Sequence, residues 1–505
     1  MRYLPDANQM KEADSYTIHQ LGIPSLELME RAARACVEYI KEWKLDLSKL
    51  CVLCGSGNNG GDGFAIARMF AQEGVDVTAI LVGNAEHCTA ETAHQIEQLK
   101  GTAAHYSEHF DKKQFEEESY SLIIDAIFGV GLCREVSGRY AEMIASINQK
   151  KAIRMSVDIP SGISAKTGNV LGVAVCADYT VTIQETKAGL VMDPGRAYAG
   201  TCVSADIGIV PLPLEEDDET AYTLEPQDYT ALLPERNADS NKGTYGKLLM
   251  ITGSKGMAGA AYLGALAAYR TGAGLVQIYT SEDNRIILQS QLPEAIITTY
   301  DEFDEDELHR LIDWADVVSI GSGFGTKKLS KKILKETISY TKKPLVIDAD
   351  GLNILSEHME YLCGVDCSQF IFTPHMKEFE RISGVKIEEV KKDRIAALRI
   401  FVNQYGVTCV LKDSRTILLK PGERVAINLS GCAAMAKAGS GDVLAGIIAS
   451  YLAQGLSQWD AALLGVYIHG KAGEIAQDEH GPYSLLAREL ADMAGIAMKI
   501  QKETR

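Results

Sequence analysis

The chain of 505 residues is short of positive charge and has no long apolar runs. Its 50 lysines and arginines are outnumbered by 68 aspartates and glutamates, which gives a formal net charge of −18 at pH 7. This excess argues against nucleic acid or an anionic membrane as the main partner, because both repel negative charge. It does not exclude a phosphorylated small molecule, since local loops bind such ligands whatever the net charge. No run of about 18 uncharged apolar residues occurs, so we expect no membrane span.

The first residues and the cysteines indicate the cellular compartment. The N-terminal sequence MRYLPDANQMKEAD lacks the apolar core of a signal peptide, so we expect no secretory leader. The 11 cysteines are odd in number and scattered, which suits a reducing cytosol and predicts a cytoplasmic protein. Cys51 and Cys54 form a C-x-x-C pair within an expected strand. Positions three apart on a strand point to opposite faces, so we expect neither metal binding nor redox pairing there.

The alternation of apolar β-branched runs with helical stretches predicts α/β domains with mainly parallel sheets. A hydrophobic content of 46% suits a soluble globular protein, and the length predicts roughly two to four domains. The run PLPLEEDDET at 211–220 is bracketed by proline and rich in acid, so it is interpreted as a linker between domains at 1–215 and 225–505. The expected strands are 50–54, 75–82, 121–127, 153–157, 179–183 and 201–207 in the first half, and 247–252, 275–279, 317–320, 345–347, 370–372 and 407–411 in the second.

The most informative segment is NLSGCAAMAKAGSGDVLAG at 428–446. Its small residues end in Gly439-Ser440-Gly441-Asp442 and continue into an apolar helical pattern. Glycines at a helix start allow close approach of a ligand, and the free N–H groups of the first turn favour an anion such as phosphate. A carboxylate would repel that phosphate, so Asp442 is interpreted as a base for a neighbouring substrate hydroxyl. The alternative is an aspartate that only caps the helix.

The run GSGNNGGDG follows the first strand of the first half and opens a helix. Gly55, Gly57 and Gly60 match the dinucleotide fingerprint G-x-G-x-x-G. That fingerprint normally requires an acidic residue at the end of the second strand, but Asp76 lies near the start of that strand. An ordinary NAD-dependent dehydrogenase is therefore disfavoured. The doubled Asn and Gly suggest side-chain amides held against a polar ligand, with Asp62 beside them.

Asp125 and Asp158 follow apolar runs in the loops DAIFGVGL and SVDIPSG. We expect both carboxylates to emerge at the same edge of the sheet, where ligands gather in open parallel sheets. Alternatively, Asp125 could cap the next helix, and Asp158 could brace the turn at 160–162.

The motifs GNNGGDG, DAIFGVG, SVDIPSG and ETKAGLVMDPGRAYAG, with GIPSLELMERAA at 22–33, resemble the NAD(P)H-hydrate epimerase family across nearly all of residues 1–210. The resemblance implies a Rossmann-like three-layer domain that interconverts the R and S forms of hydrated NADH or NADPH. It also implies K⁺ ligands at Asn59, Asp125 and Ser161, and oxygen donors suit such a hard cation. Our hypothesis is that Asp158 handles the proton chemistry at the hydrated carbon. The substrate contacts that the resemblance implies are Asn58, Asn59, Gly60, Gly61, Asp62, Gly129, Val130, Gly131, Leu132, Cys133, Arg134, Glu135 and Asp158.

In the second half, two segments after strands leave alternatives open. His375 follows a strand and a proline, with Glu378 three residues on, and is either a structural hydrogen-bonding group or part of a site. Lys412 ends a strand before the turn DSRT, which could touch phosphate or form a hairpin. The small residues of GMAGAA permit close approach of a ligand or of a neighbouring strand.

The motifs KGTYG, GMAGAAYL, GSGFG, DADGLN, TPHMKEFERISG and AGSGDVLAG resemble the ADP-dependent NAD(P)H-hydrate dehydratase, a ribokinase-like α/β protein, over roughly residues 225–500. Two departures from the family concern the nucleotide contacts. Asp413 stands where glycine often follows the lysine, and Gly431-Cys432-Ala433 stands in place of a frequent Asn-Pro-Gly. The resemblance implies hydrate contacts at Ala260, Gly323, His375 and Asp442, and ADP contacts at Lys412, Asp413, Ser414, Arg415, Thr416 and Gly441.

Together the two resemblances imply a bifunctional repair enzyme for NAD(P)H hydrates. The first domain would equilibrate the epimers, and Asp442 of the second would draw the proton from the C6 hydroxyl as it attacks the terminal phosphoryl group of ADP. Mg²⁺ is expected with ADP, and phosphate loss would restore NADH or NADPH. We also expect a homo-oligomer.

Two alternatives remain from sequence. One is a ribokinase-like kinase for a sugar or vitamin precursor, fused to a nucleotide-binding domain, which would release a stable phosphorylated product. The other is a nucleotide-binding sensor or scaffold without turnover, which has little use for Asp158 and Asp442.

Overall fold

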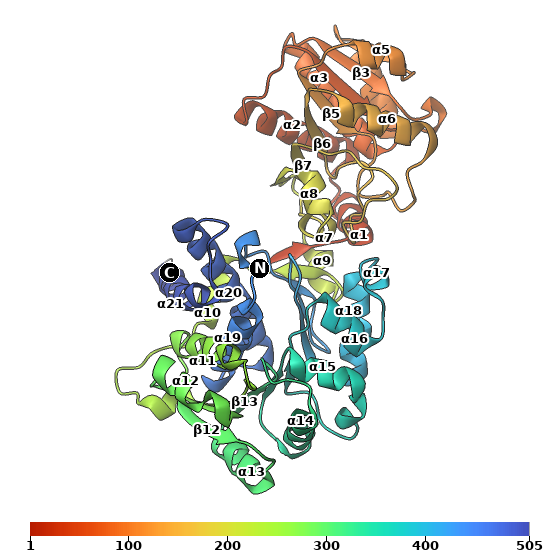
Figure 1. Ribbon diagram of the computed structural model, residues 1–505. Helices are drawn as coiled ribbons and strands as arrows, with labels where there is room; N and C mark the ends of the chain where they lie inside the picture. Colours follow the sequence, from red (N-terminus) through yellow and green to blue (C-terminus); the bar gives the residue numbers. More distant parts are fainter. Residues whose placement is uncertain (504–505) are drawn as a thin grey trace. The chain divides into compact units, whose positions relative to one another are not determined.

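A computed structural model describes residues 1–503 and divides the chain into two compact units (Figure 1). One unit is Tyr3–Ala221, and the other joins Met1–Arg2 to the residues from Tyr222 onward. Both are built on mainly parallel sheets with helices between the strands, which confirms the α/β class. Among the described residues, no helix combines the length and the apolar character needed to cross a membrane.

The first unit is built on a seven-stranded sheet whose described pairings are all parallel. In the order of the sheet, its strands are β4 (His105–Ser107), β3 (Val77–Leu81), β2 (Leu50–Cys54), β5 (Leu122–Ala126), β6 (Ile153–Val157), β7 (Tyr179–Ile183) and β8 (Thr201–Ala205). Its helices are α1 (Ala7–His19), α2 (Ser25–Glu42), α3 (Asn58–Gln72), α4 (Ala90–Lys100), α5 (Lys112–Glu117), α6 (Gly138–Gln149), α7 (Ala188–Val191), α8 (Gly195–Ala199) and α9 (Leu212–Glu216).

Two apolar cores on opposite faces of this sheet make the unit three-layered (Figure 1). Residues of α2, α3 and α4 pack on one face, and residues of α5 and α6 pack on the other. Cys54 belongs to the first core and Cys51 to the second. The two thiols therefore point to opposite faces, which confirms that this C-x-x-C is packing and not a paired site.

The acidic run at 211–220 differs from the linker expected from sequence. Residues 212–216 form α9, and Leu214 is buried against Met10 and Ala13 of α1 and Ile209. The division between the units falls after this run, at Ala221. The buried Leu214, together with a hydrogen bond from Gln9 to Asp217, thus attaches a mostly exposed segment to the first unit.

The second unit is built on an eleven-stranded sheet, parallel from β10 to β16 and antiparallel at the β16–β17 and β17–β18 pairs. Lys412–Thr416 connects the antiparallel strands β16 and β17 and therefore forms a hairpin turn. In the order of the sheet, the strands are β1 (Arg2–Leu4), β9 (Ala221–Thr223), β18 (Ala426–Ile427), β17 (Ile417–Leu419), β16 (Thr408–Leu411), β15 (Phe370–Phe372), β14 (Leu345–Ile347), β13 (Val317–Ile320), β10 (Lys247–Ile251), β11 (Leu275–Ser281) and β12 (Ile296–Tyr300).

The helices of this unit are α10 (Pro226–Leu232), α11 (Ala258–Arg270), α12 (Arg285–Gln291), α13 (Glu305–Trp314), α14 (Lys328–Tyr340), α15 (Asp350–Glu357), α16 (Met376–Ser383), α17 (Ile387–Val390), α18 (Arg394–Tyr405), α19 (Ser440–Ala453), α20 (Gln458–His480) and α21 (Ala487–Glu503). The glycine-rich segment singled out from sequence leads into α19, whose residues from Val443 to Ala453 are all buried. The apolar pattern thus places this helix in the core and fixes the position of its first turn.

We expect Gly446→Ala to lower the free energy of unfolding by about 1–3 kcal/mol, because α11 and α19 pack backbone to backbone at this point. A Cβ at Gly446 would lie 2.1 Å from the carbonyl oxygen of Gly264. Gly259→Ala on α11 is the matched control, since its Cβ would meet nothing within 4 Å. Urea unfolding of both variants tests the packing, and equal stability of the two would contradict it.

Candidate active sites

A cavity of about 770 Å³ lies at the carboxyl ends of β2, β5 and β6 in the first unit, where ligands bind in parallel sheets. Most of the hydrate contacts implied by the resemblance line it. They are Asn58, Asn59, Asp62, Gly129, Val130, Gly131, Leu132, Cys133, Arg134 and Asp158. Gly60, Gly61 and Glu135 do not contribute to the cavity wall.

The doubled Asn and Gly form the first turns of α3, which begins at Asn58 directly after the N-cap Gly57. Gly60 and Gly61 are buried. A Cβ at Gly60 would lie 1.9 Å from the carbonyl oxygen of Gly55, and one at Gly61 would lie 2.5 Å from the terminal methyl of Met29. The two glycines therefore allow close packing, while the neighbouring amides and carboxylate face the cavity.

Asp158 lies just after β6 in the left-handed region, with φ of 66°, and its side chain is almost fully buried. Its Oδ1 accepts from the Nζ of Lys187 at 2.6 Å and from the backbone N–H of Ile183 at 3.3 Å. Its Oδ2 accepts from the N–H of Val130 at 3.1 Å. These contacts fix the Gly129–Val130 loop and not the turn at 160–162, so the bracing alternative fails.

Lys187 was not singled out from sequence, although it lies within the motif ETKAGL. Its side chain is 1% exposed, and the ammonium also donates to Thr182 Oγ1 at 3.0 Å and to the carbonyl of Ile183 at 2.7 Å. A lysine between a threonine and an alanine gives no pattern that distinguishes a buried ammonium from a surface one. Only the folded chain brings it to Asp158.

Asp125 lies at the same, carboxyl edge of the sheet as Asp158, as expected, but its carboxylate is fully buried there. It lies within β5, is fully buried, and accepts from Ser156 Oγ at 2.8 Å and from Ser161 N and Oγ at 2.8 and 2.5 Å. Burial raises the pKa of Asp125, although the hydrogen bonds from Ser161 oppose this shift. It also caps no helix, because the next helix begins at Gly138.

Asn59 has the most unusual environment in this region. Both polar atoms of its side chain are buried and make no hydrogen bond within the described residues. A Cβ at Gly129 would lie 3.1 Å from Asn59 Cγ and 3.2 Å from Asp158 Oδ2, so the Gly129 backbone lies close to both side chains. Buried amides normally make hydrogen bonds, so the side chain of Asn59 is a candidate for contact with a ligand in the cavity.

Asp62 and Asp14 complete the acidic lining of the cavity. Burial raises the pKa of Asp62 well above its usual value, and the charges of Asp158 and Asp14 add to the shift. Burial also raises the pKa of Asp14, with the charge of Glu91 as a second cause. Asp14 was missed from sequence because an acid on an amphipathic helix looks like an ordinary solvated group.

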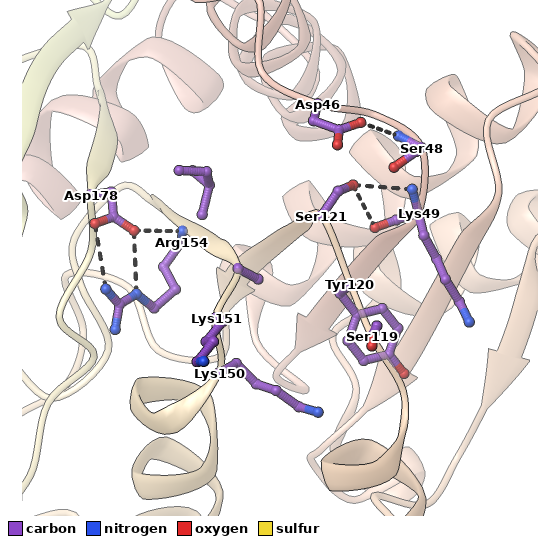
Figure 2. A pocket seen from close by; sticks show the side chains of 12 residues that line it. Asp46, Ser48, Lys49, Ser119, Tyr120, Ser121, Lys150, Lys151, Arg154 and Asp178 are labelled. Atoms are coloured by element: carbon purple, nitrogen blue, oxygen red, sulfur yellow. Dashed lines mark hydrogen bonds and ion pairs between the residues drawn. The ribbon is translucent and has the colours of Figure 1, made fainter.

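A second cavity of about 700 Å³ lies at the opposite, amino-terminal ends of β2, β5 and β6 (Figure 2). Its polar groups are already engaged with one another. Asp178 accepts from Arg154 Nε at 3.3 Å, and Ser121 Oγ exchanges two hydrogen bonds with the backbone of Lys49 at 2.9 and 3.0 Å. Because this end of a parallel sheet is not where ligands bind, we do not regard it as an active site.

In the second unit, Asp442 is the third residue of α19, and Gly439 in the left-handed conformation is the N-cap. The capping alternative for Asp442 is therefore wrong. Burial raises the pKa of Asp442 to about 6, and the charge of Asp348 adds to this shift. A hydrogen bond with Ser322 and the charge of Lys412 oppose it. This value suits a general base at neutral pH.

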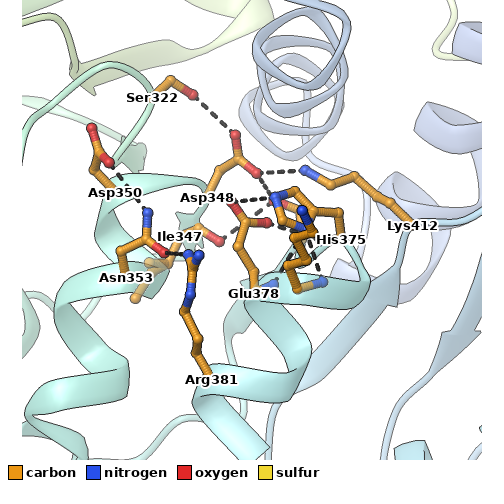
Figure 3. A network of polar contacts seen from close by, with 11 residues as sticks. Ser322, Ile347, Asp348, Asp350, Asn353, His375, Glu378, Arg381 and Lys412 are labelled. Atoms are coloured by element: carbon orange, nitrogen blue, oxygen red, sulfur yellow. Dashed lines mark hydrogen bonds and ion pairs between the residues drawn. The ribbon is translucent and has the colours of Figure 1, made fainter. Parts of the chain in front are cut away.

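Asp348 connects the loops that follow β13, β14, β15 and β16 (Figure 3). Its Oδ1 accepts from Lys412 Nζ at 2.9 Å and from Thr373 Oγ1 at 2.6 Å, and its Oδ2 accepts from Ser322 Oγ at 3.2 Å. Burial lowers the pKa of Lys412, but the charges of Asp348 and Glu378 outweigh it and the pKa is raised. Lys412 is thus held as a fixed cation beside Asp442.

His375 has a structural role that does not remove it from the site. Its Nδ1 accepts from the N–H groups of Lys377 and Glu378 at 3.1 and 3.2 Å, and Glu378 Oε2 accepts from the N–H of His375 at 2.9 Å. This capping box begins α16. Burial and the charge of Lys412 lower the pKa of His375. The ring remains about half exposed, and its Nε2 lies 3.4 Å from Oε1 of Glu378 (Figure 3).

The other residues implied by the resemblance lie on these loops. A Cβ at Gly323 would lie 2.6 Å from the Cβ of Ala260, and one at Gly441 would lie 3.3 Å from Lys412 Nζ. Gly323 and Ala260 are therefore neighbours, as are Gly441 and Lys412. The residues of the β16–β17 turn are Asp413 and Ser414, which are exposed, and Arg415 and Thr416, which are partly buried.

His469 of α20 was also missed from sequence. It is buried, and its Nε2 lies 2.9 Å from the carbonyl oxygen of Ser440, the first residue of α19. Burial lowers the pKa of His469 to about 4, so the ring is neutral and Nε2–H donates to that carbonyl. It fixes the glycine turn that presents Asp442. A lone histidine in an apolar helix carries no signal of this contact.

Two parallel α/β units, one with an acid-lined cavity and one with a carboxylate in a glycine-initiated helix turn, define a two-domain α/β enzyme. A family model described as YjeF-related protein N-terminus matches residues 25–189, and one described as NAD(P)H-hydrate dehydratase matches residues 248–494. The chain belongs to the family of bifunctional NAD(P)H-hydrate repair enzymes, because relatives of that name match it along nearly its whole length.

The relatives and a solved structure make the similarity quantitative. The bifunctional NAD(P)H-hydrate repair enzyme Nnr of Coxiella burnetii is 34% identical over 97% of this chain and 98% of that protein. The enzyme of the same name from Moorella thermoacetica is 32% identical over 99% of this chain and 97% of that protein. A ribokinase-like superfamily protein from Enterococcus faecalis V583 is 28% identical, with a TM-score of 0.51 over 56% of this chain and 96% of that one. The second unit is thus ribokinase-like.

Proposed function

We propose that this protein repairs hydrated nicotinamide nucleotides in two steps, one in each unit. The first unit interconverts the R and S forms of NADH or NADPH hydrate, and the second removes water from the S form at the expense of ADP. The observation that carries the second step is the position of Asp442, in the first turn of α19 and next to the Lys412–Asp348 pair.

In the second unit, the Asp442 carboxylate takes the proton of the C6 hydroxyl of the hydrate as that oxygen attacks the terminal phosphoryl group of ADP. The free N–H groups of the first turn of α19 then stabilise the negative charge of the transferring group. Mg²⁺, bound with the nucleotide, would supply further charge neutralisation. AMP is the leaving group of this transfer. Phosphate then leaves C6 with the electron pair of the C6–O bond, a proton leaves C5 to solvent, and the C5=C6 double bond of the ring is restored.

The nucleotide is placed beside Gly441 and the β16–β17 turn, Asp413–Thr416. Lys412 is hydrogen-bonded to Asp348 and contributes its positive charge from that position. The partly exposed turn Asp413–Thr416 then contacts the nucleotide. The hydrate then lies toward Ala260, Gly323 and His375. The contact between Ala260 and Gly323 makes a small-residue wall that the flat nicotinamide ring can approach closely.

We expect kcat/KM for dehydration to fall as the pH decreases through about 6. Burial and the charge of Asp348 raise the pKa of Asp442 to about 6, so the ionised base predominates above this pH and is lost below it. The pH profile of kcat/KM with the S hydrate measures this group in the free enzyme. A rate constant that stays level or rises on acidification would rule out an ionised Asp442 as the base.

Product analysis distinguishes this function from a kinase. Purified protein with S hydrate, Mg²⁺ and ADP, or ATP in a parallel reaction, should release inorganic phosphate in equal amount to the reduced nicotinamide formed. A ribokinase-like kinase would instead accumulate a stable phosphorylated compound. If neither nucleotide yields reduced nicotinamide, the dehydratase assignment is wrong.

In the first unit, the cavity receives the hydrated nicotinamide between the amides of Asn58 and Asn59 and the carboxylate of Asp158. Asn59, Asp125 and Ser161 would hold K⁺ at its base. The orphaned amide of Asn59 and the oxygen atoms of Asp125 and Ser161 are a donor set that suits a hard cation. Such an ion would balance the buried charge of Asp125 and order the loop that follows it.

We also infer assembly into a homo-oligomer in the cytoplasm. Ile286 and Ile287 of α12 and Ile296 of the edge strand β12 are exposed apolar side chains on neighbouring elements. Edge strands with exposed apolar residues favour pairing with another chain, and a second copy would cover this one.

A further inference from the structure

The acidic side chains of the first cavity fall into two kinds. Both oxygens of Asp158 are acceptors, for the ammonium of Lys187 and for the N–H groups of Ile183 and Val130. Asp62 faces the same cavity but makes no hydrogen bond or ion pair among the described residues. One carboxylate is therefore fixed in place, and the other is free to exchange a proton with a ligand.

We propose that Asp62 carries the proton in the epimerisation, and that Asp158 is the fixed carboxylate that stabilises the cationic ring formed on the way. This inference rests on the proposed epimerase function and changes the role that sequence assigned to Asp158. Proton transfer needs a group within hydrogen-bond reach of the ligand that is not already committed to the protein. Asp62 meets that condition, and Asp158 does not.

The reaction balances without any further reactant. Asp62 as the neutral acid gives its proton to the C6 hydroxyl, the C6–O bond breaks with its electron pair on oxygen, and water forms. The lone pair of the ring nitrogen forms a C=N bond, and the resulting cation lies near the negative charge of Asp158. Water adds to C6 from the other face, a new C6–O bond forms, and the excess proton returns to the Asp62 carboxylate.

The surroundings of Asp62 favour its protonated form. Burial raises its pKa, and the charges of Asp158 and Asp14 raise it further. Two carboxylates whose surroundings separate their roles are a recurring device in acid–base catalysis. The other titratable or charged groups that line the cavity are Lys11, Cys133, Arg134, Tyr140 and Lys187. The charge of Asp62 also acts on the buried thiols of Cys36 on α2 and Cys54 on β2.

Asp62→Asn tests the assignment in the full-length protein. With a mixture of R and S NADH hydrates, ADP and Mg²⁺, the S fraction is consumed by the second unit and the R fraction only after epimerisation. We expect the S phase to keep its rate and the R phase, after subtraction of the spontaneous rate, to slow by about 10²–10⁴. Asp76→Asn, at an exposed position before β3, is the matched control and should keep both phases.

The pH profile of the R phase excludes a merely structural role. In the wild type it should fall as the pH rises through the pKa of Asp62, because the neutral acid is lost, and Asp62→Glu should shift this limb while keeping part of the rate. An R phase in Asp62→Asn within about threefold of wild type would overturn the inference. Absence of an R phase in the wild type would instead overturn the proposed function, so the two failures are distinguishable.

Discussion

Replacing Asp442 by asparagine is expected to lower the rate of hydrate dehydration by about 10²–10⁴, the usual contribution of a general base. Asparagine keeps the size and the polarity of the side chain but cannot accept the proton of the C6 hydroxyl. Nucleotide affinity should survive or rise slightly, because a negative charge near the phosphates is removed. Steady-state kinetics with S hydrate and equilibrium binding of ADP measure the two effects separately.

Asp306→Asn is a suitable control for this variant. Asp306 also lies in the first turn of a helix, α13, but is exposed and makes no described contact with the site. Its replacement should change neither measurement. Near-full turnover by Asp442→Asn would show that another group takes the proton, while a parallel loss of nucleotide binding would show that the variant disturbs the turn itself.

The second large effect is expected at Lys187, because its removal leaves a buried carboxylate without its ionic partner. We expect Lys187→Met to lower the free energy of unfolding of the first unit by about 3–5 kcal/mol. The side chains of Lys187 and Asp158 are 1% and 8% exposed, so water cannot solvate the remaining charge when its partner is removed. Hydrogen exchange followed by mass spectrometry, on peptides of β6 and β7, reports this unit separately from the other.

A double-mutant cycle isolates the interaction free energy between Lys187 and Asp158. Asp158→Asn combined with Lys187→Met removes both charges, so the double variant should be more stable than Lys187→Met alone. If the single variant exchanges as slowly as wild type, the ammonium does not stabilise the carboxylate and Asp158 is not held as described. The epimerase phase should be lost in both, since each change disturbs the fixed carboxylate.

The strands that could be predicted from sequence are those that a short run of apolar residues marks by itself. Six expected strands, at 50–54, 153–157, 179–183, 317–320, 345–347 and 370–372, coincide with the observed ones, because central parallel strands are continuous apolar runs. The omitted strands include β4, β12 and β18, which are short, at an edge, or partly polar. Their pairing depends on neighbours that lie far away in the sequence, so a local pattern cannot identify them.

The sequence predicted which motifs form the sites, but it did not predict the contacts of the individual side chains. The position of Asp442 in a glycine-initiated helix followed from spacing alone, since small residues before an apolar helix have few other uses. The burial of Asp125 and the pairing of Lys187 with Asp158 did not follow, because the direction of a side chain at a strand end depends on the exact residue at which the strand stops. The contact of His469 with Ser440 joins positions 29 residues apart and has no local signature.

The central claim is that one chain restores both epimers of a hydrated nicotinamide nucleotide. The most direct measurement mixes purified protein with R and S NADH hydrates, ADP, Mg²⁺ and K⁺, and follows the near-ultraviolet absorbance of reduced nicotinamide. The account predicts recovery of the whole mixture, in a fast phase for the S form and a slower one for the R form. Recovery that stops at the S fraction would contradict the epimerase half, and no recovery with ADP or ATP would contradict the repair function as a whole.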